Sequence, residues 1–97
     1  MIRVHPRTLE KRPWLSEREL ISTWDNAARL RPREGDHEPR QKMAVGWDWH
    51  GRLYELIAYK GEAENEWVIF HAAPAKKKFL LEMGFSEQEI RQLIGRR

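Results

Sequence analysis

The chain has 97 residues and a formal net charge of +3 at pH 7, from 18 basic and 15 acidic side chains. This length suits one domain and leaves little room for a second. The absence of cysteine excludes disulfide bonds and zinc sites with thiolate ligands. The sequence lacks both the apolar run of a signal peptide and the longer run of a membrane span, so we expect a cytoplasmic protein without membrane contacts.

The basic residues gather toward the two ends of the sequence. Residues 1–40 carry nine basic and seven acidic side chains, residues 41–72 carry three and five, and residues 73–97 carry six and three. This distribution favours a partner that bears phosphate groups. The alternative is an ordinary solvated surface, because a charge of +3 is small for a dedicated nucleic-acid-binding protein.

A helix is predicted over residues 16–31. Ser16 and Glu19 have the spacing of a capping box, in which each side chain bonds the backbone N–H of the other residue. Apolar side chains then recur at helical spacing until Pro32 stops the run. Residues 2–5 are considered as a short additional strand, and residues 32–41, rich in charge and proline, are predicted to form a mobile charged loop.

Three strands are predicted over residues 43–49, 53–59 and 67–72. His50 and Gly51 join the first two in a tight turn, where Gly51 is free to take a positive φ. Because consecutive strands with short connections usually pair, these strands form an antiparallel meander.

The third strand carries apolar side chains on both faces. Simple alternation directs Val68, Phe70 and Ala72 to one face, and it directs Trp67, Ile69 and His71 to the other. Either helices cover both faces of the sheet, or one face is left for a partner.

Two short helices are predicted after the strands. Pro74 suits the first turn of the first helix and Gly84 its C-terminal end, while Ser86 and Glu89 form a capping box for the second. Residues 1–97 are therefore expected to form a single α+β domain with an N-terminal helix, a three- to four-stranded antiparallel β-meander and C-terminal helices.

The sequence contains no nucleotide-binding loop, metalloprotease motif or nucleophile elbow. Its four histidines form no closely spaced pair, so neither a metal nor another cofactor is expected. His71 closes the apolar third strand beside a basic segment. It is either a hydrogen-bonded histidine at a sheet edge or a general acid or base, since imidazole titrates near neutral pH.

Lys76, Lys77 and Lys78 open the helix that follows the third strand. Cations at this end oppose the helix dipole, a placement that suits phosphate binding, although a solvated face is the alternative. Arg52 and Glu55 could add a phosphate-binding cation and a base. Their odd spacing sends them to opposite faces of a regular strand, so they share a site only if Arg52 belongs to the turn.

Five tryptophans could stack on nucleic-acid bases. Trp24 and Trp67 are expected in the core. Trp49, beside the predicted turn, is the best exposed candidate for such stacking.

Three segments resemble BrnT-type toxins, which belong to the RelE/ParE toxin superfamily. Residues 11–19, KRPWLSERE, resemble the family's KHGVSFEE motif at the start of its first helix. Residues 45–59 resemble its IG…GRLLVVVY hairpin, and residues 68–72 with the basic helix start resemble its IRIISAR strand and Arg-rich sequel. The resemblance implies a toxin that cleaves RNA and is neutralised by a small ribbon-helix-helix antitoxin.

The implied reaction is attack of the ribose 2′-oxygen on the adjacent phosphate, which needs a base, cations and an acid for the leaving oxygen. Arg52 matches the family's GR arginine, Lys11 and Arg12 match its KH pair, and the three lysines match its basic helix start. The expected catalytic residues are His71, Arg52, Lys77 and Glu55, and the expected RNA contacts are Lys11, Arg12, Lys76, Lys78 and Trp49.

Two departures from the family motif concern the catalytic groups. The family's arginine falls at Ala73 and its strand serine at His71, so a lysine or His71 itself must replace that arginine. The alternative is a non-catalytic protein-binding module of the same fold, which would hold an antitoxin or a second copy of the chain. Contact with duplex DNA is a weaker alternative, because no helix-turn-helix is predicted.

Overall fold

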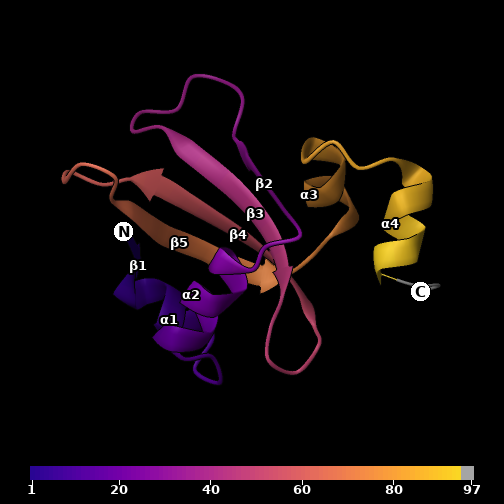
Figure 1. The fold of residues 1–97 in the computed structure, drawn as a ribbon, viewed down its shortest axis with the longest axis horizontal. Coiled ribbons are helices and arrows are strands. Elements are labelled where there is room, and N and C mark those ends of the chain that lie inside the picture. The colour runs from indigo at the N-terminus through magenta and orange to yellow at the C-terminus, as the bar shows by residue number, and fades with distance from the viewer. Residues whose placement is uncertain (95–97) are drawn as a thin grey trace.

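A five-stranded mixed sheet organises residues 1–94, the part of the chain that this computed structural model describes (Figure 1). The strand order across the sheet is β1-β5-β4-β3-β2. The predicted α+β class is therefore confirmed. In chain order the elements are β1 (Ile2–Val4), α1 (Pro6–Lys11), α2 (Glu17–Asp25), β2 (Arg29–Pro32), β3 (Gln41–Trp47), β4 (Leu53–Lys60), β5 (Trp67–Pro74), α3 (Lys77–Glu82) and α4 (Glu87–Ile94).

The predicted antiparallel meander is present as β3, β4 and β5, and β2 extends it to four strands. The short strand considered near the N-terminus is β1, and it pairs in parallel with β5. This parallel pair makes the sheet mixed. After β1, the chain crosses from one edge of the sheet to the other through α1 and α2, and the meander begins there.

The helix predicted over residues 16–31 is wrong at its C-terminal end. The helix α2 ends at Asp25, and residues 29–32 form β2. The side chain of Asn26 donates to the carbonyl of Ser22 at 2.9 Å, and the N–H of Ala28 already donates to the carbonyl of Val45 in β3 at 2.8 Å. Pairing with the edge of β3 thus overrides the helical spacing of the apolar residues.

Of the two predicted capping boxes, the second forms completely, and the first forms only one of its two bonds. The hydroxyls of Ser16 and Ser86 accept the N–H groups of Glu19 and Glu89, each at 3.1 Å. The Glu89 carboxylate bonds back to the N–H of Ser86 at 2.8 Å. The buried carboxylate of Glu19 instead accepts the N–H of Trp49 at 3.0 Å, which ties α2 to the turn after β3.

The helical role predicted for Pro74 is wrong. Pro74 is the last residue of β5, opposite Tyr54, and α3 begins at Lys77 with Lys76 as its N-cap. A proline is tolerated at a strand end, where no ladder N–H is needed. The proline that does open a helix is Pro6, in the short helix α1, which the sequence patterns did not predict.

Helices cover both faces of the sheet, so the core has two layers. The α1–α2 face buries Leu20, Tyr54, Leu56 and Ile69, and the partly buried Trp24 and Trp67 pack beside them. The α3–α4 face buries Met43, Ile57, Leu80 and Met83, among others. None of the helices within residues 1–94 combines the length and apolar character needed to cross a membrane.

A β-bulge interrupts β5 and changes which face its side chains occupy. Ile57 pairs with His71 and Ala58 pairs with Ile69, so Phe70 is an extra residue without a partner opposite it. The simple alternation predicted for this strand is therefore wrong after Ile69. Ile69 and Ala72 both lie in the α1–α2 layer, whereas His71 faces the α3–α4 side.

The segment predicted as a mobile charged loop connects β2 to β3, although its two end residues belong to those strands. Arg33 ties the loop to α3, because its Nε lies 3.0 Å from the carboxylate of Glu82. The mobility of the loop stays a prediction.

Candidate functional site

Glu55 and His71 form a hydrogen-bonded pair on the α3–α4 side of the sheet. Glu55 Oε2 lies 2.8 Å from His71 Nε2, between the neighbouring strands β4 and β5. The Glu55 side chain is buried, whereas the His71 side chain is 38% exposed. The imidazole is thus held from the protein side and accessible from the solvent side.

The second oxygen of Glu55 is also occupied, because Oε1 accepts the backbone N–H of Lys76 at 2.9 Å. With both oxygens bonded, the carboxylate has one orientation and fixes the imidazole ring in turn. In the neutral tautomer that donates Nε2–H to Glu55, Nδ1 carries the lone pair that can accept a proton. The pair therefore provides the elements of a positioned general base.

A groove of about 290 Å³ opens beside this pair, and we call it the Glu55–His71 groove. Arg33 is held there by Glu82 and by the side chain of Gln41, to which it donates at 2.9 Å. Within residues 1–94, no carboxylate forms an ion pair with Lys76 or Lys78. Their charge is therefore available to an anion. The lining residues are Arg33, Glu55, Ile57, His71, Lys76, Lys78, Phe79 and Glu82.

Lys77, predicted as a catalytic residue, does not line the groove. Its Nζ lies 2.8 Å from Glu87 Oε1, and this hydrogen bond holds the pKa of Glu87 below its ordinary value. The neighbouring lysines face the groove because successive helical residues point in different directions.

Arg52 is likewise separate from Glu55 and His71. Arg52 does belong to the turn, which was the condition for it to share a site with Glu55. However, its Nε lies 2.8 Å from Asp48 Oδ2. Its guanidinium lies over the ring of Tyr54, on the α1–α2 side. Glu55 faces the opposite side. The structure thus brings together Glu55, His71, Lys76 and Lys78 of the predicted site residues, and leaves Arg52 outside.

Asp48 organises the turn that holds Arg52. Its Oδ1 accepts the N–H groups of His50 at 2.9 Å and Arg52 at 2.8 Å. Burial raises the pKa of Asp48, but the backbone and side-chain hydrogen bonds from Arg52 and the bond from His50 bring that pKa below its ordinary value. The hydrogen bond to Asp48 in turn raises the pKa of Arg52. The Asp48–Arg52 ion pair therefore stabilises the hairpin.

The remaining predicted RNA contacts lie in three different places. Trp49 is 60% exposed and its indole N–H donates to the hydroxyl of Ser22 on α2. The guanidinium of Arg12 lies 5.8 Å from the ring centroid of Trp14. Lys11 lines a second groove, which contains neither Trp49 nor Arg12.

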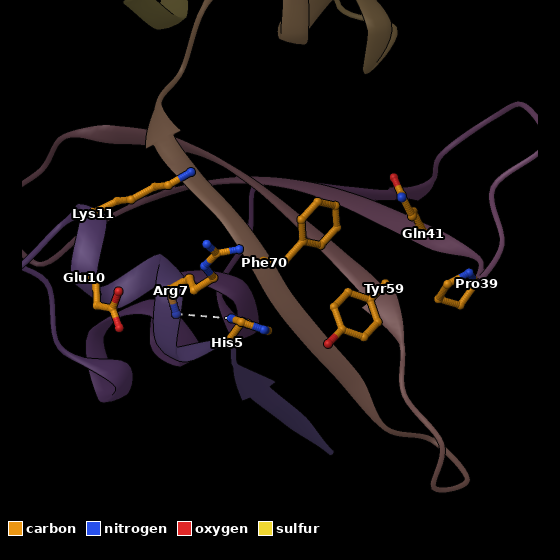
Figure 2. A pocket seen from close by; sticks show the side chains of 8 residues that line it. All are labelled: His5, Arg7, Glu10, Lys11, Pro39, Gln41, Tyr59 and Phe70. Carbon is orange, nitrogen blue, oxygen red and sulfur yellow. Dashed lines mark hydrogen bonds between the residues drawn. The ribbon is translucent and has the colours of Figure 1, made fainter.

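This second groove, of about 620 Å³, is the aromatic groove (Figure 2). Its floor carries Tyr59 and Phe70, whose ring centroids are 5.6 Å apart at an interplanar angle of 43°. It also contains Gln41, which accepts the hydrogen bond from Arg33 of the Glu55–His71 groove, so the two grooves adjoin. Its lining residues are His5, Arg7, Glu10, Lys11, Pro39, Gln41, Tyr59 and Phe70.

Sequence reasoning did not single out Arg33, Gln41, Tyr59 or Phe70. Arg33 stood in a segment that resembled any charged loop, and Gln41 was included in it. Tyr59 and Phe70 were counted only as strand-forming aromatics. These four residues come together through the pairing of β2 with β3 and the bulge in β5. Neither feature has a local sequence motif, so the sequence alone did not indicate them.

Within the part of the chain that the structure describes, no group of three or more His, Cys, Asp or Glu side chains could hold a metal ion. In the comparisons with known proteins, no family model, no curated protein and no solved structure matches the chain, so the resemblance to BrnT-type toxins stays a prediction.

Proposed function

We propose that the protein is an endoribonuclease toxin in which His71 is the general base, positioned by Glu55. The observation that carries the proposal is the hydrogen bond between buried Glu55 and accessible His71, in a groove that also holds Lys76 and Lys78 without carboxylate partners among residues 1–94. A base, a positioning carboxylate and cations are the groups that attack by a ribose 2′-hydroxyl requires.

In the proposed reaction, His71 Nδ1 takes the proton from the 2′-hydroxyl, and the 2′-oxygen forms a bond to the adjacent phosphorus. The bond between phosphorus and the 5′-oxygen breaks, which leaves a 2′,3′-cyclic phosphate and a free 5′-hydroxyl. The proton on that leaving oxygen comes from a lysine ammonium or from water. Lys76 and Lys78 offset the negative charge that builds up on the phosphorane oxygens.

The two lysines also offer a replacement for the family arginine, whose position is Ala73 here. Ala73 is buried opposite Glu55 on the groove side of the sheet, and its methyl group carries no charge, so the positive charge in the groove comes from the lysines and Arg33. As in the toxins it resembles, we propose that the protein acts in the cytoplasm and is neutralised by a small ribbon-helix-helix antitoxin.

The decisive experiment incubates the purified protein with single-stranded RNA and analyses the product ends. Cleavage that leaves a 2′,3′-cyclic phosphate is expected, and a 2′-deoxy substitution at the cleaved nucleotide should block it. His71→Ala should lower the rate by about 100- to 10,000-fold, the usual contribution of a general base. His50→Ala is the matched control, because His50 lies in the turn after β3, outside both grooves.

A second comparison tests the cations. Lys78→Ala should lower cleavage, whereas Lys42→Ala should not, since the Lys42 ammonium lies over the ring of Trp67 on the α1–α2 side. Overexpression of the wild type should arrest growth, and His71→Ala should relieve the arrest. Absence of cleavage by the wild type on free and ribosome-bound RNA would refute the proposal, as would a His71→Ala variant of full activity.

The second candidate is a non-catalytic protein-binding module. It is favoured by an exposed aromatic surface beside the turn between β3 and β4, away from the aromatic groove. Trp14 and Trp47 are largely exposed there, around a hollow that also includes Leu93 and Ile94. Large exposed apolar side chains that lie together are typical of protein-contact surfaces. Size-exclusion chromatography distinguishes the two candidates: a stable protein complex or self-association without RNA turnover supports the module.

A further inference from the structure

We propose that the aromatic groove is a subsite that stacks one unpaired base of a single-stranded RNA beside the phosphate at His71. The inference rests on the proposed function and specifies the substrate: the base must be accessible, as it is in a loop or a single strand. In a duplex, both faces of a base are covered by its neighbours.

The bulge in β5 is the first observation that carries this inference. In a regular strand, Phe70 and His71 would point to opposite faces of the sheet. Because Phe70 is the extra residue of the bulge, its ring instead packs against Tyr59 of β4, while His71 bonds Glu55 of the same strand. Tyr59 and Glu55 are four residues apart in β4 and share one face, so Phe70 and His71 do as well.

The surface that results is an aromatic platform next to the proposed base. Phe70 is 37% exposed, whereas the other two phenylalanines, Phe79 and Phe85, are buried. In Figure 2 the rings of Phe70 and Tyr59 stand beside each other at the centre of the groove, between α1 and the segment that carries Pro39. A planar base can stack on such a ring whatever its identity, because every base has a π-face.

The rim of the groove is positive, which selects a phosphate-bearing occupant over an apolar peptide. Arg7 and Lys11 are four residues apart in α1, so they project from one side of that helix toward the groove (Figure 2). Within residues 1–94, neither forms an ion pair with a carboxylate. Glu10 is the single carboxylate in the lining.

The two grooves form one path for a strand. Arg33 lines the Glu55–His71 groove and donates to Gln41 of the aromatic groove at 2.9 Å. A base on Phe70 would therefore have one flanking phosphate near Arg7 and Lys11 and the other near His71 and Lys78. This arrangement accounts for Lys11, which the Glu55–His71 groove alone leaves without a role.

The test measures binding of a fluorescent single-stranded RNA with 2′-deoxy substitutions, which prevent cleavage, to the wild type and to variants. Phe70→Leu should weaken binding about 5- to 150-fold, the usual loss for one stacked base. Phe70→Trp keeps an aromatic ring at this position and should bind with nearly the affinity of the wild type. Leu30→Ala is the control, because Leu30 is an exposed apolar side chain of β2 that lines neither groove. Arg7→Ala should weaken binding and reduce the dependence of log Kd on log salt by about one unit.

Different outcomes separate this inference from the proposed function. With a cleavable strand, Phe70→Leu should raise KM and leave kcat near the wild-type value. Cleavage that is unaffected by Phe70→Leu and Arg7→Ala overturns the subsite and leaves the nuclease intact. Binding that depends on both residues without any cleavage supports the subsite and refutes the nuclease. The subsite is also overturned if the protein binds duplex and single-stranded RNA with equal affinity. It is likewise overturned if an acidic peptide displaces all of the RNA and Phe70→Leu has no effect on RNA binding.

Discussion

The carboxylate of Glu55 is held at both oxygens, by the imidazole of His71 at 2.8 Å and by the backbone of Lys76 at 2.9 Å. One buried residue therefore positions the proposed base and the start of the lysine-bearing helix α3 together. Any rearrangement of Glu55 is expected to disturb both.

A double-mutant cycle tests this relationship. Glu55→Gln keeps the size of the side chain but removes its charge, so it should lower kcat and leave KM nearly unchanged. Because Glu55 acts through His71, the double variant should be no slower than His71→Ala alone. Rates for the single and double variants under saturating RNA provide the measurement, and additive losses would show that the two residues act independently.

Asp48 is predicted to be the most sensitive polar residue of the β3–β4 turn. Asp48→Asn exchanges one acceptor oxygen for a donor that faces the Arg52 guanidinium, and we expect it to lower the free energy of unfolding by about 1–3 kcal/mol. Urea denaturation gives this value. Arg52→Gln is the control and should cost less, because half of the Arg52 side chain is exposed and its ion pair is screened by solvent.

The same residue gives a pH dependence. Because the pKa of Asp48 in the folded protein lies below its ordinary value of 3.8, the folded state binds fewer protons than the unfolded state. The stabilisation by Asp48 is fully present above that value and is lost as the pH falls through the folded-state pKa. The difference in unfolding free energy between the wild type and Asp48→Asn should therefore be constant near neutral pH and shrink as the pH falls below 3.8. A constant difference would contradict this assignment.

Gly46 is predicted to tolerate no side chain, since it lies where α2 crosses β3. A Cβ atom there would come 2.7 Å from the backbone oxygen of Thr23 and 3.3 Å from the Cα of Ala27. Backbone atoms cannot rotate away as a side chain can, so Gly46→Ala should force α2 from the sheet and cost about 1–3 kcal/mol. An unchanged melting temperature would show that the contact relaxes freely.

The parts of the fold that sequence reasoning predicted are those with local signals. Runs of β-forming residues marked β3, β4 and β5, and the Ser86–Glu89 box marked α4. The strand β2 was missed because its stability comes from the edge of β3, which is distant in sequence. The same holds for the site: Lys76 and His71 are near neighbours in the chain, whereas Arg33 reaches them only through the folding of the sheet.

The sequence contains a local pattern that predicts the structural role of Arg52. Asp48 and Arg52 are four residues apart across a Gly-containing turn, a spacing that lets a carboxylate bond both the backbone and the side chain of the later residue. Such an acidic partner within the turn indicates an arginine already engaged in structure.

The extra residue in β5 is the one residue of that strand whose removal would leave the pairing on either side of it intact. Ile69 pairs with Ala58 and His71 pairs with Ile57, so deletion of Phe70 would make Ile69 and His71 neighbours in a regular ladder and leave each on its present face of the sheet. The imidazole would stay beside Glu55, and the ring that packs against Tyr59 would be lost. A one-residue deletion should therefore remove the aromatic platform while the Glu55–His71 pair persists.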